Sequence, residues 1–358
     1  MKKVCLITCY KQPDYIRAKT LRTAIGDIKD VELIVVKNKH TGLWRYVEVV
    51  GKLIAVRLTK HPDTYFLTFR GYEMLPITRL LTLGKPLIFD EFINLMEWVI
   101  DEHHKIKQKS LLAKFLYGNY RFWLKKVQLI ATDTMSHAKY SANLMKLPID
   151  KYVPLIVSTD EQTFGGAKVA TRRHKGPFRV FYYGNMLPLH GIEVVLQAMH
   201  DLKGRDIELQ LIGGNSKIQQ LVKQAKSDGV KVNYKTWVSF ADLPSYMQLA
   251  DVCLGGPFGN TVQSKFVITG KTYQLLQMGL PVIIGKNLES ELFTDKLDSL
   301  IVRQNNADSL AGAILWAKNH PTELKKIGQN GRKLYQEKLS NHKLSEQLRL
   351  MFANKHLL

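Results

Sequence analysis

Residues 178–201 read FRVFYYGNMLPLHGIEVVLQAMHD, and this stretch decides the fold. Apolar and aromatic residues predict a strand over Phe178–Tyr183, and the apolar spacing predicts a helix over Ile192–Asp201. Between them lie Gly184, a short polar turn and Gly191. A glycine turn before a helix leaves backbone N–H groups free to bind an anion such as a phosphate. A plain strand–helix connection is the alternative, since isolated glycine loops are common.

The same order of strand and helix recurs on both sides of this stretch. Because strands that alternate with helices form parallel sheets, we predict an α/β protein with two Rossmann-like βαβ domains facing across a cleft. The boundaries are 1–160, a Gly-rich basic linker over 161–177, and 178–335. The other predicted strands are Val4–Cys9, Glu32–Lys37, Thr64–Phe69, Pro86–Asp90, Gln128–Asp133, Glu208–Ile212, Lys231–Tyr234, Asp251–Leu254, Pro281–Gly285 and Ser299–Val302, and helices are predicted over Tyr15–Asp27 and Tyr72–Leu83.

Charge and composition limit the partners. The chain has 358 residues with 52 Lys and Arg against 31 Asp and Glu, a net charge of +21, which requires a polyanionic neighbour. Three cysteines are too few for a disulfide framework, so a reducing compartment is expected. The sequence shows no signal peptide and no apolar run long enough to span a bilayer. We therefore expect a cytoplasmic protein.

Two further glycine loops follow predicted strands of the second domain. Gly213 and Gly214 end one strand, and residues 255–271, GGPFGNTVQSKFVITGK, end another. Since the carboxyl ends of parallel strands meet at one edge, we expect the three loops to cradle a diphosphate, with Lys265 and Lys271 as counterions. A solvated lysine pair is the alternative.

Four segments in register resemble the donor domain of glycosyltransferase family 4 enzymes, which have the GT-B fold. They are FYYGNMLPLHGIEVVLQAM, ELQLIGG, VNYKTWVSFADLPSYMQLADVCLGG and KTYQLLQMGLPVII. The closing segment, residues 316–352, is similar to the family's tail, whose last helix returns to the first domain. The resemblance therefore implies a GT-B fold in which about 336–358 joins the domain of residues 1–160. The resemblance implies transfer of a sugar from a UDP- or GDP-linked donor, retention of configuration and no bound metal or other cofactor. The absence of an Asp-x-Asp triplet agrees with the last expectation.

The sequence departs from the family at four donor positions. Asn185 and His190 stand where the family has arginine and lysine, and Phe266 and Gln274 replace its two glutamates. Gln274 retains hydrogen-bonding capacity for a ribose, whereas Phe266 does not replace a carboxylate. We expect Lys265 and Lys271 to supply the missing charge. The predicted donor site is Gly184, Asn185, His190, Gly191, Gly213, Gly214, Lys265, Lys271, Tyr273 and Gln274.

Candidates in the first domain follow its predicted strands. Asp90, in PLIFDEF, lies where many family members have a histidine or aspartate that faces the sugar. We therefore predict that Asp90 is catalytic, as are Lys265 and Lys271. An Asp that caps the following helix is the alternative. The predicted acceptor side holds Tyr10, Phe69, Arg70 and His137. Arg70 is otherwise a surface charge, and His137 a packing residue.

A basic segment without acidic residues covers residues 105–126. Its Leu and aromatic residues, Leu112, Leu116, Tyr120 and Trp123, recur at helical spacing. Such a helix suits the interface of an anionic bilayer, whereas a core-facing helix with solvated lysines is the alternative. Nucleic acid is disfavoured because no recognition motif is present. The predicted membrane residues are Lys105, Lys107, Lys109, Lys114, Arg121, Trp123, Lys125 and Lys126.

These observations predict a glycosyltransferase peripheral to the inner face of a membrane. Its acceptor is expected to be a lipid-linked or cell-surface glycan. The altered glutamate positions keep a second hypothesis open, a catalytically silent GT-B protein that binds a partner transferase or a glycan. A nucleotide-sugar epimerase of the same fold is the third.

Overall fold

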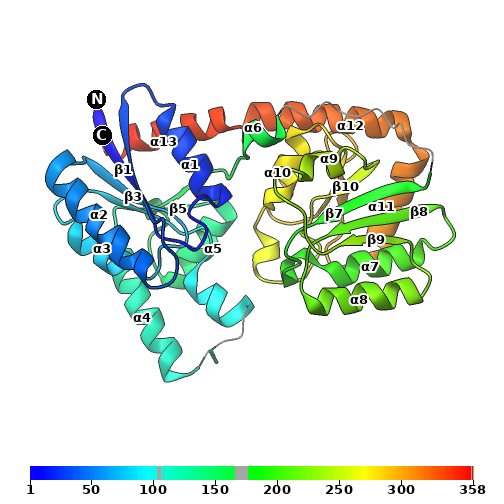
Figure 1. The fold of residues 1–358 in the computed structure, drawn as a ribbon, viewed down its shortest axis with the longest axis horizontal. Coiled ribbons are helices and arrows are strands. Elements are labelled where there is room, and N and C mark those ends of the chain that lie inside the picture. The colour runs from blue at the N-terminus through cyan, green and yellow to red at the C-terminus, as the bar shows by residue number, and fades with distance from the viewer. Residues whose placement is uncertain (103–105, 108, 166–175, 356, 358) are drawn as a thin grey trace. The chain divides into compact units, whose positions relative to one another are not determined.

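The computed structural model describes residues 1–102, 106–107, 109–165, 176–355 and 357, which form two compact units (Figure 1). Unit 1 combines Met1–Ser158 with Asn341–Leu358, and unit 2 comprises Thr159–Ser340. The chain therefore leaves unit 1, builds the whole of unit 2 and then returns to unit 1.

Unit 1 contains a six-stranded parallel sheet in the order β2-β1-β3-β4-β5-β6. Every residue of β3, β4 and β5 is buried, as expected for a parallel sheet covered on both faces. The strands are β1 (Lys2–Thr8), β2 (Val31–Lys37), β3 (Thr64–Leu67), β4 (Leu87–Asp90), β5 (Leu129–Thr132) and β6 (Tyr152–Pro154).

Alternate residues of β1 face two separate cores. Cys5 and Ile7 pack with the helices α2 to α5, while Val4 and Leu6 pack with α1 and α13. The second core includes Leu344 and other residues from the end of the chain. The helices are α1 (Ile16–Gly26), α2 (Trp44–Lys60), α3 (Leu75–Leu81), α4 (Leu111–Lys126), α5 (Met135–Met145) and α13 (Asn341–Asn354).

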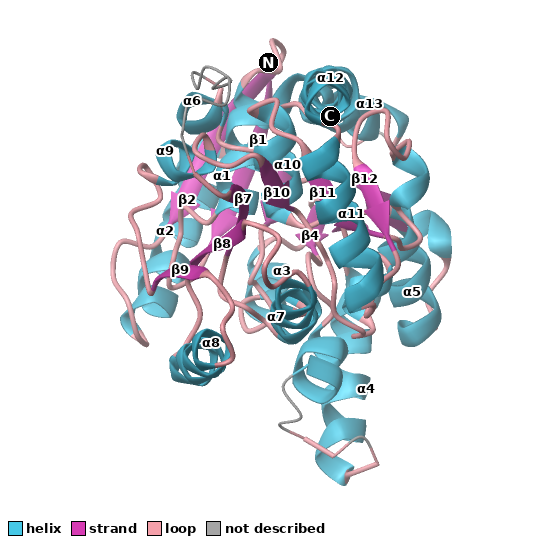
Figure 2. Cartoon of the chain, turned by 90° about the vertical axis from the view of Figure 1, so that its right-hand side faces the viewer, coloured by secondary structure: helices cyan, strands magenta, loops and turns pink. Residues whose placement is uncertain are grey.

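Unit 2 repeats this architecture with the strand order β12-β11-β10-β7-β8-β9. Helices flank the strands in Figure 2; α7 packs against α11, and α10 against α12. The strands are β7 (Phe178–Tyr183), β8 (Ile207–Ile212), β9 (Val232–Lys235), β10 (Val252–Leu254), β11 (Val282–Gly285) and β12 (Leu300–Val302). The helices are α6 (Glu161–Phe164), α7 (Ile192–Asp201), α8 (Ser216–Ser227), α9 (Leu243–Met247), α10 (Gly270–Gln277), α11 (Ala307–Asn319) and α12 (Pro321–Leu334).

The predicted α/β fold is confirmed, with three differences in detail. The three-residue strand β6 was not predicted, and the helix predicted over Tyr72–Leu83 is shorter at both ends. The segment predicted as a linker begins instead with α6, whose Phe164 is fully buried in unit 2, while residues 166–175 lie outside the described residues. Among the described helices, none is both long and apolar enough to cross a membrane.

Candidate functional site

The ends of β7 and β8 meet at two glycines. Gly213 has φ +101°, and a Cβ atom there would lie 2.2 Å from the carbonyl oxygen of Gly184. Only glycine permits this approach. The Tyr234 hydroxyl donates to the Gly213 carbonyl oxygen at 3.1 Å and holds the turn in place.

The loop after β10 packs against the loop after β7. The Gly259 N–H donates to the Leu189 carbonyl at 3.0 Å. Gly191 has φ +64°, and a Cβ there would lie 2.5 Å from the Gly259 nitrogen. The structure therefore brings the three glycine loops together at the carboxyl edge of the second sheet.

Lys271 supplies a buried ammonium group at this edge. Its side chain, in the first turn of α10, is 6% exposed, and Nζ lies 5.2 Å from the centre of the Tyr182 ring. A Cβ on Gly184 would lie 3.6 Å from Nζ. Among the described residues, Nζ has no hydrogen-bond or ion-pair partner. Burial lowers the pKa of Lys271 to about 7. A bound anion would therefore compensate the positive charge of the Lys271 ammonium group.

His190 and Lys271 both lie next to Gly184. Burial, and then the charge of Lys271, lowers the pKa of His190 well below its ordinary value. Its Nδ1 is buried without a hydrogen-bond partner among the described residues. The following helix α7 has Gly191 as its N-cap residue and no side-chain cap, so its first N–H groups remain available to an anion.

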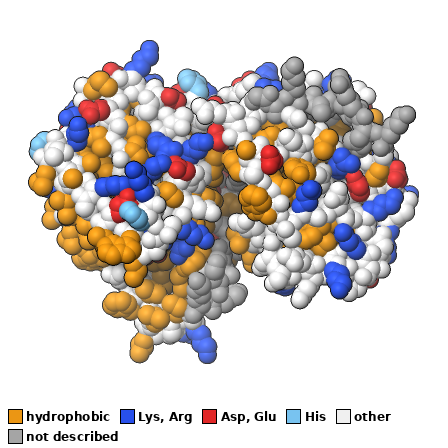
Figure 3. All heavy atoms as spheres, viewed as in Figure 1, with side chains coloured by type: hydrophobic (Ala, Val, Ile, Leu, Met, Phe, Trp, Pro, Cys, Tyr) orange, Lys and Arg blue, Asp and Glu red, His pale blue; other side chains and the backbone are white. Residues whose placement is uncertain are grey.

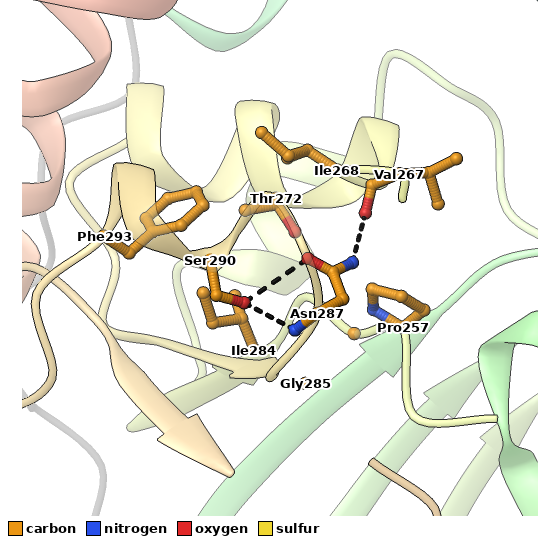
Figure 4. Close-up of a pocket in the computed structure, with 10 residues that line it drawn as sticks. Pro257, Val267, Ile268, Thr272, Ile284, Gly285, Asn287, Ser290 and Phe293 are labelled. Atoms are coloured by element: carbon orange, nitrogen blue, oxygen red, sulfur yellow. Dashed lines mark hydrogen bonds between the residues drawn. The ribbon is translucent and has the colours of Figure 1, made fainter. Parts of the chain in front are cut away.

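Lys265 is exposed, and the segment that carries it is anchored from behind. The Asn287 amide donates to the carbonyls of Ser264 and Val267 at 3.0 and 2.8 Å, and Gln304 donates to Ser264 at 2.7 Å. Asn287 also lines a small pocket between this segment, β11 and α10 (Figure 4). Its other lining residues are Gly256, Pro257, Val267, Ile268, Thr272, Ile284, Gly285, Ser290 and Phe293.

The other predicted donor residues differ in accessibility. Asn185 is exposed on the loop after β7, and Gly214 precedes α8. Gln274 is buried and its amide oxygen accepts a hydrogen bond from the Tyr183 hydroxyl. Tyr273 is 1% exposed. Its side chain lies inside unit 2.

Asp90 is part of a buried ion pair, whereas the prediction placed it facing a ligand. Asp90 and Arg17 are both fully buried, with Arg17 Nη2 3.0 Å from Asp90 Oδ1. The Phe69 N–H donates to Oδ2 at 3.2 Å. Arg17 also donates to the carbonyls of Leu155 and Ile156 at 2.7 and 2.8 Å. The pair joins the carboxyl ends of β4 and β6, which is a structural role.

The predicted acceptor residues separate into a buried and a partly accessible group. His137 is fully buried, and its Nδ1 lies 2.7 Å from Asp133 Oδ1. Burial opposes the charged ring, but Asp133 raises the pKa of His137. Tyr10 and Arg70 are half-buried; Tyr10 packs against Phe69 with ring centres 5.8 Å apart, and the Arg70 guanidinium lies 3.9 Å from the centre of the Trp98 ring. The packing alternative therefore fits His137.

The basic helix α4 has two different faces. Tyr120 is buried in the core, with Leu116 and Trp123 packed against it, so the predicted stripe faces the protein except at Leu112, which is exposed. Arg121 also turns inward and donates to the Met145 carbonyl at 2.7 Å. The exposed side holds Leu111, Leu112, Phe115, Phe122, Lys114, Lys125 and Lys126; Lys107 and Lys109 before the helix are exposed too, and Lys105 lies outside the described residues.

Sequence reasoning missed Arg17, Tyr182 and Asn287. Arg17 and Asn287 act through partners that are far away in the sequence, so no local pattern indicates them. The sequence indicates Tyr182 only as part of a strand. Its position two residues before the glycine turn is the one signal that could have placed it under Lys271.

Comparison with solved structures concerns the fold of the whole chain. HepE of Anabaena in complex with UDP-glucose has a TM-score of 0.73 at 11% identity, over 99% of this chain and 100% of that one. Sucrose-phosphate synthase of Thermosynechococcus elongatus has a TM-score of 0.72 at 15% identity, over 99% of both chains. The lipopolysaccharide galactosyltransferase WaaB has a TM-score of 0.69 at 10% identity, over 99% and 100%. These likenesses show the GT-B fold.

A family model matches part of the chain by sequence. Residues 177–320 match the family model of group 1 glycosyl transferases. No curated protein matches the chain by sequence. Residues 177–320 are therefore similar to a group 1 glycosyl transferase domain, and the whole chain shares the GT-B fold with the three structures above.

Proposed function

We propose that the protein transfers a sugar from a UDP- or GDP-linked donor to a hydroxyl of a lipid-linked or cell-surface glycan, with retention of configuration and without a metal. HepE, which shares the fold, binds UDP-glucose, and this supports a nucleotide-sugar donor. The diphosphate would lie on the three glycine loops of unit 2. Residues from the first domain would bind the acceptor.

The buried ammonium of Lys271 carries this proposal. A buried cation without a counterion is costly unless a bound anion compensates for it. The start of α7 adds N–H donors on the same side of the glycine turn. When the glycosidic bond breaks, negative charge develops on the leaving diphosphate, and Lys271 would stabilise it in a partly dry site. Lys265 would contribute a second, more solvated charge.

Donor titration tests the proposal directly. UDP, GDP and their sugar conjugates are added to the protein, and the unfolding temperature is followed. A ligand that binds only the folded state raises that temperature in proportion to the logarithm of its concentration above Kd. We expect one nucleotide to stabilise the protein at micromolar to millimolar concentrations. A flat response to every nucleotide would exclude the proposed donor site.

The acceptor would be held at a membrane surface. The exposed lysines Lys107, Lys109, Lys114, Lys125 and Lys126 support binding to anionic lipid. A lipid-linked acceptor could then meet the protein without leaving the bilayer. Cytoplasmic location, at the inner face of a membrane, is part of this proposal.

A catalytically silent protein is the second candidate. It is favoured by Phe266, which is buried where the family has a carboxylate, and by Gln274, whose oxygen is engaged by Tyr183. Release of nucleoside diphosphate in the presence of a membrane extract separates the two. Nucleotide binding without any turnover would favour the silent protein, and donor conversion without an acceptor would indicate an epimerase.

A further inference from the structure

Helix α2 is apolar on both of its sides. Val49 and Leu53 are fully buried in the core of unit 1. On the opposite side, Trp44, Val47 and Leu58 are 72%, 62% and 68% exposed. Surface helices of soluble proteins present polar residues to water, and a helix with apolar residues on both sides is typically buried on both. The outer side of α2 therefore has the composition of a side that another surface covers.

The exposed apolar surface continues over the next two helices. Helix α3 contacts both α2 and α4, and all three pack on the same core, so their outer sides form one face of unit 1 (Figures 1 and 3). We call this surface the apolar face. Its residues are Leu43, Trp44, Val47, Ile54, Leu58, Ile77, Leu80, Leu83, Leu111, Leu112, Phe115 and Phe122, each at least 38% exposed. Large exposed apolar patches on soluble proteins mark interaction sites.

The charge around the apolar face has one sign. Residues 43–60, 75–85 and 111–126 contain ten Lys or Arg and a single acidic residue, Glu48. The Glu48 side chain is only 12% exposed and is held by Lys52 Nζ at 2.5 Å. Long basic side chains can lie along an apolar surface while their charged ends stay in water or contact phosphates. The face therefore complements an apolar layer bordered by negative charge.

These features favour a lipid bilayer over a second copy of the chain. In a twofold dimer the same face meets itself, so basic rims would be brought together at an energetic cost. An anionic bilayer offers the opposite sign to the lysines and an acyl layer to Leu and Phe. Tryptophan prefers the boundary between the two, which suits Trp44 at the start of α2.

We propose that the apolar face of α2, α3 and α4 docks the protein on an anionic lipid bilayer. Trp44, Leu58 and Phe115 would enter the boundary between headgroups and acyl chains, and the surrounding lysines and arginines would contact lipid phosphates. This inference extends the proposed function from the basic residues of α4 to an insertion surface dominated by α2. Docking itself needs neither donor nor transfer.

Vesicle co-sedimentation tests the proposal with the full-length protein. The vesicles contain equal amounts of phosphatidylglycerol and phosphatidylcholine, or phosphatidylcholine alone. Trp44→Ser/Leu58→Ser removes two apolar side chains that contact mostly solvent, and Trp237→Ser is the matched control because Trp237 in unit 2 is 75% exposed. Unchanged unfolding temperatures establish that both variants fold.

We expect the double variant to bind anionic vesicles roughly tenfold more weakly than the wild type, because it lacks two apolar side chains that would be buried in the lipid. The Trp237→Ser control should bind like the wild type, and binding should weaken at high salt. Equal binding of the double variant and the wild type would overturn the proposal. So would equal binding to neutral vesicles, or a wild-type dimer in light scattering that the double variant abolishes. Nucleotide stabilisation is measured in parallel, so a failed donor site is not mistaken for failed docking.

Discussion

Replacing Lys271 with methionine should stabilise the protein while removing its nucleotide binding. The methionine retains most of the length of the lysine stem but carries no charge. In the ligand-free protein Lys271 is buried over the Tyr182 ring without an anion, so its ammonium group is a cost to folding. The same group is the proposed partner of the diphosphate. Lys271→Met therefore separates stability from function.

The magnitude follows from the pKa of Lys271. Burial lowers that pKa from 10.5 to about 7. Between these values the unfolded chain binds one more proton than the folded protein, so stability falls as the pH drops from 10.5 to 7. At about 1.4 kcal/mol per pKa unit, the cost at pH 7 is roughly 4 kcal/mol. Lost lysine contacts offset part of it, so we expect Lys271→Met to gain about 2–3 kcal/mol, or at least roughly 4 °C in unfolding temperature.

Thermal unfolding of Lys271→Met with and without UDP or GDP measures both effects. We expect a higher unfolding temperature without ligand at pH 7, a smaller difference at pH 10, and no further rise with nucleotide. Lys265→Met is the matched control, because Lys265 is exposed on the neighbouring segment. It should leave the unfolding temperature unchanged and weaken nucleotide binding less.

Two results would refute this reasoning. If Lys271→Met lowers the unfolding temperature at pH 7, the lysine makes a stabilising contact and is not an uncompensated charge. If the variant still gains the wild-type stabilisation from nucleotide, Lys271 is not the phosphate partner. The second result would leave the glycine loops as a site without its central cation.

Three further predictions concern Arg17, Gly213 and Glu91. Arg17→Met should lower the free energy of unfolding by about 3–5 kcal/mol, because it removes the partner of the buried Asp90 carboxylate. A loss below about 1 kcal/mol in urea unfolding would contradict this. Gly213→Ala should cost about 2–4 kcal/mol and abolish nucleotide binding, since its Cβ would clash with the Gly184 carbonyl at 2.2 Å; a crystal structure with unchanged loops would show otherwise. Burial raises the pKa of Glu91 from 4.5 to about 7, so stability should fall as the pH rises from 4.5 to 7. Glu91→Gln should remove roughly 3 kcal/mol of this fall in stability, measured by urea unfolding at the two pH values. An unchanged fall would rule out Glu91 as its source.

The strand and loop pattern was predictable because it is local. The predicted strand Phe178–Tyr183 matches β7 at both ends, because the glycine that ends the strand directly follows it in the sequence. Strand β6 was missed because three residues carry too little periodicity, and it is held by pairing with β5.

Side-chain roles at the site were less predictable. Asp90 ends its strand as expected, but its partner Arg17 lies 73 residues earlier in the chain. On α4 the sequence shows apolar residues all round without indicating which of them meet the core. The structure assigns Tyr120 to the core and Phe115 to the outside. Tertiary contacts decide such questions, and a single sequence does not record them.

The return of α13 to unit 1 has a consequence for the order of folding. Leu344, Leu348, Met351 and Phe352 complete the core on one face of the first sheet, against α1. During synthesis these residues leave the ribosome only after all of unit 2. Until then Leu21 and Ile25 of α1 lack their partners, so unit 2 can finish folding while unit 1 is still incomplete. A nascent chain stalled before Asn341 should therefore show a protease-resistant second unit and a susceptible first one.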